Sequence, residues 1–349
     1  DIAAGSRQAM KYRDKLESKQ GKMAKTISKK ALDGQALDVV WNLTLATNII
    51  SANVEYGQIE KIENVKGVKQ VLIETRYEPC VVKESETTDP NMATSSNMIG
   101  SNFAWANGYT GAGSKVAIID TGADTDHPSL SGAAYSYAVK GLGITPVTSA
   151  DYADKLEKLN AFKKNGDLKA SDLYVSAKIP FAFDYAGKDA QVAPGSKWEA
   201  ENLEHGTHVA GIAAGYAVDG EGAVTFSGVA PDAQVIPMKV FDDSGTGAAT
   251  TTILAALEDA YRLGVDAVNL SLGSYGGFTV DEDALINDVY NKLDDAGIMV
   301  ITAAGNETSS SYMNSYGTNA PLTGDPDNSV VAVTAEYQGM TASFTVHVG

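Results

Sequence analysis

The sequence has few of the residues that commonly cross-link a chain or anchor it in a membrane. A single cysteine, Cys80, stands among 349 residues, so the chain cannot form an internal disulfide, and we interpret Cys80 as a plain thiol. No cluster of cysteines and histidines has the spacing of zinc ligands. No run of about 18 apolar residues occurs, so no membrane-spanning helix is expected. The first residues also lack the basic and apolar regions of a signal peptide.

Basic residues are scarce relative to acidic ones. Lysine and arginine number 27 against 44 aspartates and glutamates, which gives a net charge of −17. Such a balance argues against nucleic acid as a partner and is compatible with a secreted protein kept in solution by repulsion. The length indicates roughly two domains with capacity for a large core.

Two stretches combine apolar or small residues with a residue able to do chemistry. Residues 115–122 form an apolar run that ends on Asp120 and Gly122, and such a run predicts a buried parallel strand with Asp120 at its carboxyl end. Asp120 alone is equally consistent with a carboxylate that caps a turn. His205 opens a helix of small residues over 205–215, where the helix dipole favours a neutral imidazole fit for a general base. The alternative is a core helix that happens to begin with histidine.

A third stretch, residues 297–306, predicts another buried strand that ends on Asn306, whose amide is suited to binding an oxyanion. The three motifs are Asp120-Thr121-Gly122, His205-Gly206-Thr207-His208 and Ala304-Gly305-Asn306. Together, in this order and spacing, they resemble the subtilisin-like serine proteases, the subtilases of peptidase family S8.

The resemblance implies that Asp120 orients His205, that His205 takes the proton of a serine, and that Asn306 binds the oxyanion. The family's serine lies in a Gly-Thr-Ser-Met-Ala motif, and this motif does not occur in the sequence. Since covalent catalysis needs the nucleophile, the chain by itself is predicted to be inactive. The resemblance also implies substrate-binding edges and pocket walls, for which plain strand termini are the alternative. These residues are Gly245, Thr246, Gly247, Ser271, Leu272, Gly273, Ala303, Ala304 and Gly305.

The N-terminal region resembles the subtilase propeptide, the family's inhibitor and folding helper. Its pattern predicts a helix broken near Gly21, strands at 37–43 and 49–54, a helix at 56–65 and a strand at 68–74, which is a ferredoxin-like order without its first strand. We therefore expect a propeptide domain over 1–78, a linker with the processing site over 79–100, and the N-terminal part of the catalytic domain over 101–349. Residues 36–75 should pack against the helices of 250–262 and 282–296.

Strands that alternate with helices across 115–335 predict an α/β fold with a doubly wound parallel sheet. Residues 179–186 resemble the cell-envelope branch of the family, which includes lactocepin and the C5a peptidases. Ser129 stands where many subtilases have a calcium-binding aspartate, so a structural calcium ion is compatible with the family but has no ligand set here. We also expect the chain to continue beyond Gly349 into an inserted β-rich domain and then the serine motif.

The sequence thus predicts the precursor portion of a secreted serine endopeptidase, attached to the cell wall in the cell-envelope branch. It would act on protein or peptide substrates, hold its own propeptide in the active-site cleft, and need no cofactor for its chemistry. Two alternatives stay open. The chain is a non-catalytic binding or inhibitory fragment, or it is half of a nicked protease whose serine lies on a second chain.

Overall fold

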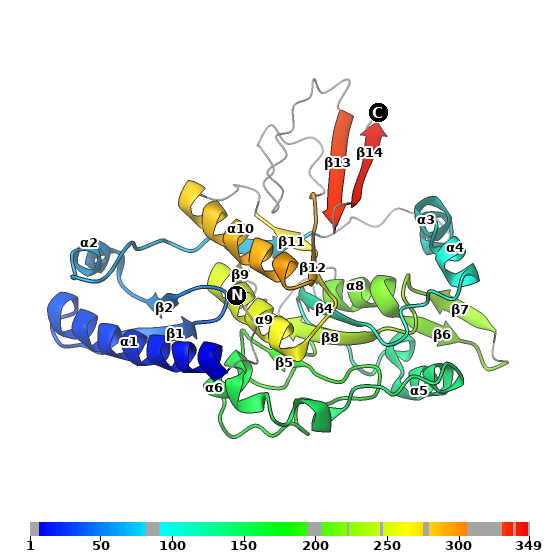
Figure 1. Ribbon diagram of the computed structural model, residues 1–349, viewed down its shortest axis with the longest axis horizontal. Coiled ribbons are helices and arrows are strands. Elements are labelled where there is room, and N and C mark those ends of the chain that lie inside the picture. Colours follow the sequence, from blue (N-terminus) through cyan, green and yellow to red (C-terminus); the bar gives the residue numbers. More distant parts are fainter. Residues whose placement is uncertain are drawn as a thin grey trace.

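The computed structural model describes residues 7–80, 91–194, 204–221, 223–244, 247–274, 279–305, 330–337 and 340–347. An N-terminal part lies beside a larger α/β part (Figure 1). The N-terminal elements are α1 (Arg7–Ala31), β1 (Asp38–Leu43), β2 (Ile49–Asn53), the 3-10 turn η1 (Tyr56–Gln58), α2 (Ile59–Glu63) and β3 (Arg76–Pro79). Strands β1 and β2 form an antiparallel hairpin, and buried Ile27 and Ile62 join α1 to α2 in a small core of their own.

The larger part is built on a five-stranded sheet in the order β12-β10-β4-β8-β5. Its strands are β4 (Lys115–Asp120), β5 (Phe183–Asp184), β8 (Gln234–Lys239), β10 (Ala267–Leu270) and β12 (Met299–Thr302). All neighbouring strands run parallel. The chain starts at the middle strand, fills one side with β5 and β8, and then fills the other with β10 and β12. The direction of winding therefore reverses beside β4, and ligands bind at such switch points in open α/β sheets.

Helices cover both faces of this sheet. Ala117 and Ile119 of β4 are buried in a cluster with residues of α9 (Thr250–Leu263) and α10 (Val280–Asp295). Ile118, which points the opposite way, is buried with Ala210 of α8 (His205–Ala214). A strand buried on both faces needs apolar side chains at every position, which explains the unbroken run in the sequence. The predicted doubly wound parallel sheet is confirmed.

A long segment between β4 and β5 folds as short turns and helices. It contains η2 (Pro128–Leu130), α5 (Gly132–Gly141), η3 (Ser149–Tyr152), η4 (Leu156–Lys158) and α6 (Asn160–Lys164). The fully buried carboxylate of Asp259 holds α6 on α9, because it accepts hydrogen bonds from the backbone N–H groups of Asn160 at 2.7 Å and Ala161 at 2.9 Å, and from the Tyr185 hydroxyl at 3.0 Å. Burial is the main cause that raises the pKa of Asp259, to about 7.

The remaining elements lie outside the main sheet. They are α3 (Asn91–Ile99), α4 (Ser101–Ala106), the antiparallel pair β6 (Tyr216–Val218) and β7 (Val224–Ser227), and the antiparallel pair β13 (Val330–Tyr337) and β14 (Met340–His347). Two more short strands, β9 (Ala248–Ala249) and β11 (Leu272–Gly273), belong to the site described below. Within the described ranges, no helix is both long and apolar enough to cross a bilayer.

Several predicted elements differ from the structure. Helix α1 runs through Gly21 without a break, because one missing side chain costs a long helix only about 1 kcal/mol. The predicted strand at 68–74 does not form beyond an isolated bridge of Val68 with Lys66, and the strand lies at Arg76–Pro79 instead. The ferredoxin-like order thus keeps its helices and its hairpin, but its last strand pairs elsewhere.

Candidate active site

Asp120 ends β4 at the carboxyl edge of the sheet. It lies between the two parallel neighbours of β4, and only 1% of its surface is exposed. Its Oδ1 accepts a hydrogen bond from the backbone N–H of Thr121 at 2.7 Å. Its Oδ2 is buried and has no hydrogen-bond partner within the part of the chain that the structure describes. A carboxylate held this way presents one fixed oxygen to its neighbour.

Helix α8 brings His205 against that oxygen. The approach depends on Gly206, because a Cβ there would lie 2.1 Å from the carbonyl oxygen of Gly122 and 3.1 Å from Asp120 Oδ1. The backbone N–H of Gly206 donates to the Thr121 hydroxyl at 3.0 Å. His205 Nδ1 then lies 2.7 Å from Asp120 Oδ1, so the two side chains are hydrogen-bonded neighbours as the sequence predicted.

The electrostatics of His205 differ from the expectation based on the helix dipole. Burial lowers the pKa of His205, but the hydrogen bond and the charge of Asp120, together with the carbonyl of Cys80, raise it above its ordinary value. Asp120 and the Cys80 carbonyl together therefore raise the pKa of His205 by more than burial lowers it. Each ring nitrogen thus faces an oxygen, Asp120 Oδ1 on one side and the Cys80 carbonyl on the other.

The second ring nitrogen of His205 faces the backbone of the chain itself. Nε2 lies 3.1 Å from the carbonyl oxygen of Cys80. The strand that leads to Cys80, β3, is the middle strand of a three-stranded antiparallel sheet in the order β11-β3-β9. The backbone N–H of Cys80 donates to the carbonyl of Ser271 at 3.0 Å. An extended peptide of this chain thus lies between two edge strands by β-addition and ends at His205.

The predicted substrate edges fall partly on these strands. Leu272 pairs with Pro79 and Gly273 pairs with Glu78, so the predicted Ser271–Gly273 edge does bind an extended peptide. The sequence did not predict that this peptide is residues 76–80. Gly247 adopts φ +84°, and a Cβ there would lie 2.6 Å from the carbonyl oxygen of Tyr77. The second edge is β9, directly after the predicted Gly245-Thr246-Gly247.

The remaining predicted site residues either follow β12 or lie outside the described residues. Ala303 continues from β12 and donates its backbone N–H to Leu270 at 3.0 Å, and Ala304 and Gly305 follow it. Gly245, Thr246 and Asn306 lie outside the described residues. Asn306 as oxyanion donor therefore stays a prediction.

Two side chains of the bound segment have distinct surroundings. Tyr77 is buried, and burial, followed by the proximity of Tyr290 and Glu282, raises its pKa well above the ordinary value. Burial and the charge of Asp120 raise the pKa of the Cys80 thiol to about 12. The thiol therefore stays protonated at neutral pH, which agrees with the interpretation of Cys80 as a plain thiol rather than a nucleophile.

The N-terminal part is anchored on α9 by Trp41 and Glu258. Trp41 is 1% exposed, donates its indole N–H to the Thr252 hydroxyl at 3.2 Å, and packs its ring 6.2 Å from that of Tyr185. The buried carboxylate of Glu258 accepts from the backbone N–H groups of Leu45 at 2.8 Å and Ala46 at 2.9 Å.

Two further carboxylates tie the segment just before β3. Glu74 accepts at 2.8 Å from the backbone N–H of Thr251 in the first turn of α9. Glu282 of α10 accepts from the backbone N–H of Thr75 at 2.8 Å. These contacts confirm the predicted packing of residues 36–75 on the two helices, whereas the domain boundaries stay predictions.

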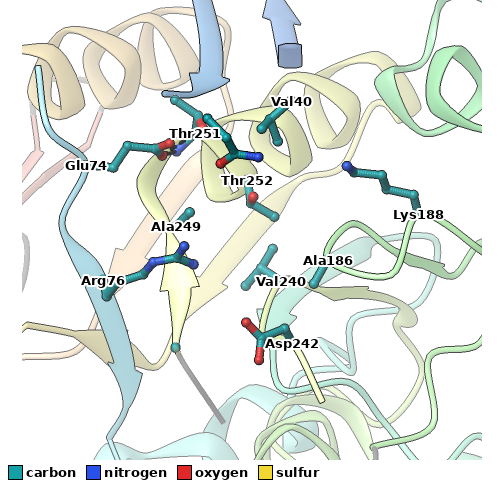
Figure 2. A pocket seen from close by; sticks show the side chains of 12 residues that line it. Val40, Glu74, Arg76, Ala186, Lys188, Val240, Asp242, Ala249, Thr251 and Thr252 are labelled. Atoms are coloured by element: carbon teal, nitrogen blue, oxygen red, sulfur yellow. Dashed lines mark hydrogen bonds between the residues drawn. The ribbon is translucent and has the colours of Figure 1, made fainter. Parts of the chain in front are cut away.

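A polar cavity of about 160 Å³ lies at the far end of β3 from His205 (Figure 2). Figure 2 shows Arg76 of β3 on one side of it and Lys188, which follows β5, on the other. Both the N-terminal part and the α/β part line this cavity, so it belongs to their interface.

The described residues do not include an evident metal site. Within the described ranges, no group of three or more His, Cys, Asp and Glu side chains could hold a metal ion. Ser129 is buried, and its hydroxyl lies 2.8 Å from His127 Nδ1. A calcium site therefore stays an expectation of the family without assigned ligands.

A doubly wound sheet with an Asp–His pair at its carboxyl edge and a peptide between two edge strands defines a subtilisin-like proteolytic fold. Residues 111–347 match the Subtilase family, and the chain belongs to this family.

The curated relatives are bacterial proteinases. The PII-type proteinase of Lacticaseibacillus paracasei is 31% identical over 297 residues, which cover 84% of this chain and 14% of the relative. The minor extracellular protease Vpr of Bacillus subtilis is 32% identical over 231 residues, 64% of this chain and 22% of Vpr. A C5a peptidase of Streptococcus pyogenes is 29% identical over 228 residues, 64% of this chain and 17% of that peptidase. The chain therefore spans only a small part of their length.

Among solved structures, fervidolysin of Fervidobacterium pennivorans, a keratinolytic enzyme related to subtilisin, has the same fold. The TM-score is 0.50 at 18% sequence identity, and the match covers 94% of this chain and 43% of fervidolysin.

Proposed function

We propose that this chain is the precursor portion of a serine endopeptidase that hydrolyses peptide bonds with an Asp-His-Ser triad. One observation carries the proposal. Asp120 forms a hydrogen bond with one ring nitrogen of His205, and the other ring nitrogen faces the Cys80 carbonyl. That carbonyl directly follows β3, the extended peptide that pairs with both β9 and β11.

Each residue has a defined role in this proposal. His205 takes the proton of a serine hydroxyl as that oxygen attacks the peptide carbonyl, and then gives the proton to the leaving nitrogen. Asp120 fixes the orientation of the imidazole and stabilises its protonated form. Asn306 supplies an N–H group to the oxyanion that forms on the attacked carbonyl.

The serine itself is assigned to residues beyond Gly349. The motif that carries it in the family does not occur among the 349 residues. The proposal therefore describes a chain that holds two members of the triad and has no proteolytic activity of its own.

Residues up to Cys80 act as the inhibitor of the same site in this proposal. The carboxylates of Glu74, Glu258 and Glu282 and the ring of Trp41 support this role, since they attach the N-terminal part to the two helices beside the cleft. A strand tethered in this way competes with a peptide substrate at high effective concentration.

The proposal places the enzyme outside the cell, with cell-wall attachment as in the cell-envelope branch. Support comes from the relatives, one of which is described as an extracellular protease. A structural calcium ion, which the family leads us to expect, takes no part in the chemistry proposed for Asp120 and His205.

Labelling with a serine-directed fluorophosphonate probe tests the assignment. The 349-residue chain is expected to show no labelling, and addition of the downstream polypeptide should restore it on that second chain only. His205→Ala in the reconstituted protein should abolish the labelling, because the serine then lacks its base. Labelling of any serine within the 349 residues would contradict the proposed roles.

A further inference from the structure

The register of β3 in the cleft singles out one peptide bond, and the inference that follows rests on the proposed function. Two hydrogen bonds bracket a single residue. The backbone N–H of Cys80 donates to the Ser271 carbonyl at 3.0 Å, and the Cys80 carbonyl oxygen lies 3.1 Å from His205 Nε2. The carbonyl that faces the general base therefore belongs to Cys80.

A shift toward the N-terminus cannot replace this register. If Pro79 took the place of Cys80, the Ser271 carbonyl would lose its donor, because proline has no backbone N–H. The register with Pro79 in the place of Cys80 is therefore excluded.

A shift by one residue in either direction would also turn every side chain of the strand to the opposite face. Tyr77 and Pro79 are buried, whereas Arg76 is exposed and Glu78 is partly exposed. After a shift, the tyrosine ring would leave its buried site beside Glu282, and a charged side chain would enter that site. Burial already raises the pKa of Glu78 at its present position, which indicates how poorly a carboxylate would fit deeper in the site.

We propose that the precursor is cleaved at the peptide bond that directly follows Cys80. The downstream serine hydroxyl attacks the Cys80 carbonyl carbon and passes its proton to His205. The C–N bond breaks, and the proton from His205 goes to the leaving nitrogen. Water then hydrolyses the serine ester, so that one water molecule is consumed, Cys80 gains a carboxylate and residue 81 gains an amino group.

The cleaved strand stays in the cleft as a product. Its new carboxylate lies beside the His205 ring, and Tyr77 remains in its buried site. Release of the cleaved segment therefore requires that β3 separate from both β9 and β11. The contacts of Trp41 and Glu258, which attach the N-terminal part to α9, must break as well.

The test maps the new chain ends in the full-length polypeptide that includes the serine motif. Intact-mass and terminal sequencing of the wild type should find a fragment that ends with the Cys80 carboxylate and one that begins at residue 81. Chain ends at any other position in an enzyme that digests casein would overturn the inference while the proposed function stands. Absence of both cleavage and casein digestion would overturn both.

Variants at the bracketed residue sharpen the test. Cys80→Pro removes the N–H that donates to Ser271 and should slow cleavage at this position at least tenfold, whereas Cys80→Ala keeps the N–H and should be cut at the same position. Equal cleavage of both variants after residue 80 would overturn the register. His205→Ala should abolish cleavage, and cleavage that persists in this variant at the same bond would overturn the role of the dyad.

Discussion

Replacement of Trp41 by alanine should detach the N-terminal part from the α/β part. The side chain is 1% exposed and forms three kinds of contact: the hydrogen bond to Thr252, the packing on Tyr185, and two lysine ammonium groups over its ring at 5.4 and 5.9 Å. Removal of a buried tryptophan costs about 3–5 kcal/mol, and the hydrogen bond and the cation–π contacts lie within that range rather than adding to it.

Native-state hydrogen exchange of the 349-residue chain measures this cost by region. A loss of about 4 kcal/mol corresponds to roughly a thousandfold faster exchange for amides whose protection depends on docking, since 1.36 kcal/mol is a factor of ten. We expect this increase in β1 and β2 and little change in β4 and β8. Tyr56→Ala, at a tyrosine of the same region that is 81% exposed, is the matched control and should change exchange less than about threefold.

The results that would contradict this prediction are also read from exchange rates in separate regions. Less than tenfold acceleration in the β1–β2 hairpin of the Trp41→Ala variant would show that the ring does not hold the two parts together. Equal acceleration in β4 and β8 would show that Trp41 stabilises the whole molecule rather than the docking. Trp41→Phe, which keeps an aromatic ring and removes the N–H donor, should cost only about 1–2 kcal/mol.

Three further predictions concern the site and its support. Gly206→Ala should lower the free energy of unfolding by about 1–3 kcal/mol or more in denaturant titration, because the new Cβ meets the Gly122 carbonyl. Asp259→Ala should lower it by about 2–4 kcal/mol, because three donors lose their common acceptor. In an NMR titration, Asp120→Asn should lower the pKa of His205 relative to the wild type. By linkage, the stabilisation that the raised His205 pKa provides in the wild type is complete below its unfolded pKa and is lost as pH rises through the folded one.

Matched controls separate these effects from general damage. Gly220→Ala introduces a Cβ with nothing within 4 Å and should be neutral beside Gly206→Ala. Asp154→Ala removes an exposed carboxylate and should change stability by less than about 0.5 kcal/mol. A His205 pKa that does not fall in the Asp120→Asn variant would mean that the carboxylate does not control the imidazole.

The sequence contains enough information to predict the sheet and the Asp120–His205 pair. Strands buried on both faces, such as β4 and β8, need apolar side chains in their middle positions, and both end on a charged residue, Asp120 and Lys239, at the carboxyl edge of the sheet. Helix α9 was predicted over nearly its full length, since its apolar face is periodic and Gly264 adopts the left-handed conformation that ends it.

The segment that occupies the cleft could not be found in this way. Residues 68–74 are rich in Val, Ile and Leu and resemble a strand locally, but apart from an isolated bridge of Val68 with Lys66 they pair with no strand of the described part of the chain. Arg76–Pro79 has a weaker pattern and contains a proline, yet two edges are available to it. Its only local indication is that Tyr77 and Pro79 alternate with charged residues. Strand formation here depends on long-range partners, which a local pattern does not contain. Likewise, α6 is fixed by Asp259, almost a hundred positions away.

The three-stranded sheet β11-β3-β9 has a consequence for how the protein avoids aggregation. Open strand edges with unpaired N–H and C=O groups invite other chains to pair with them, and β9 and β11 are two such edges facing each other. While β3 lies between them, both edges are covered by a strand of the same molecule, and no foreign strand can add there. By pairing with both edges, β3 thereby also withholds them from self-association. Without β3 between them, both edges would be open to any strand able to pair with them.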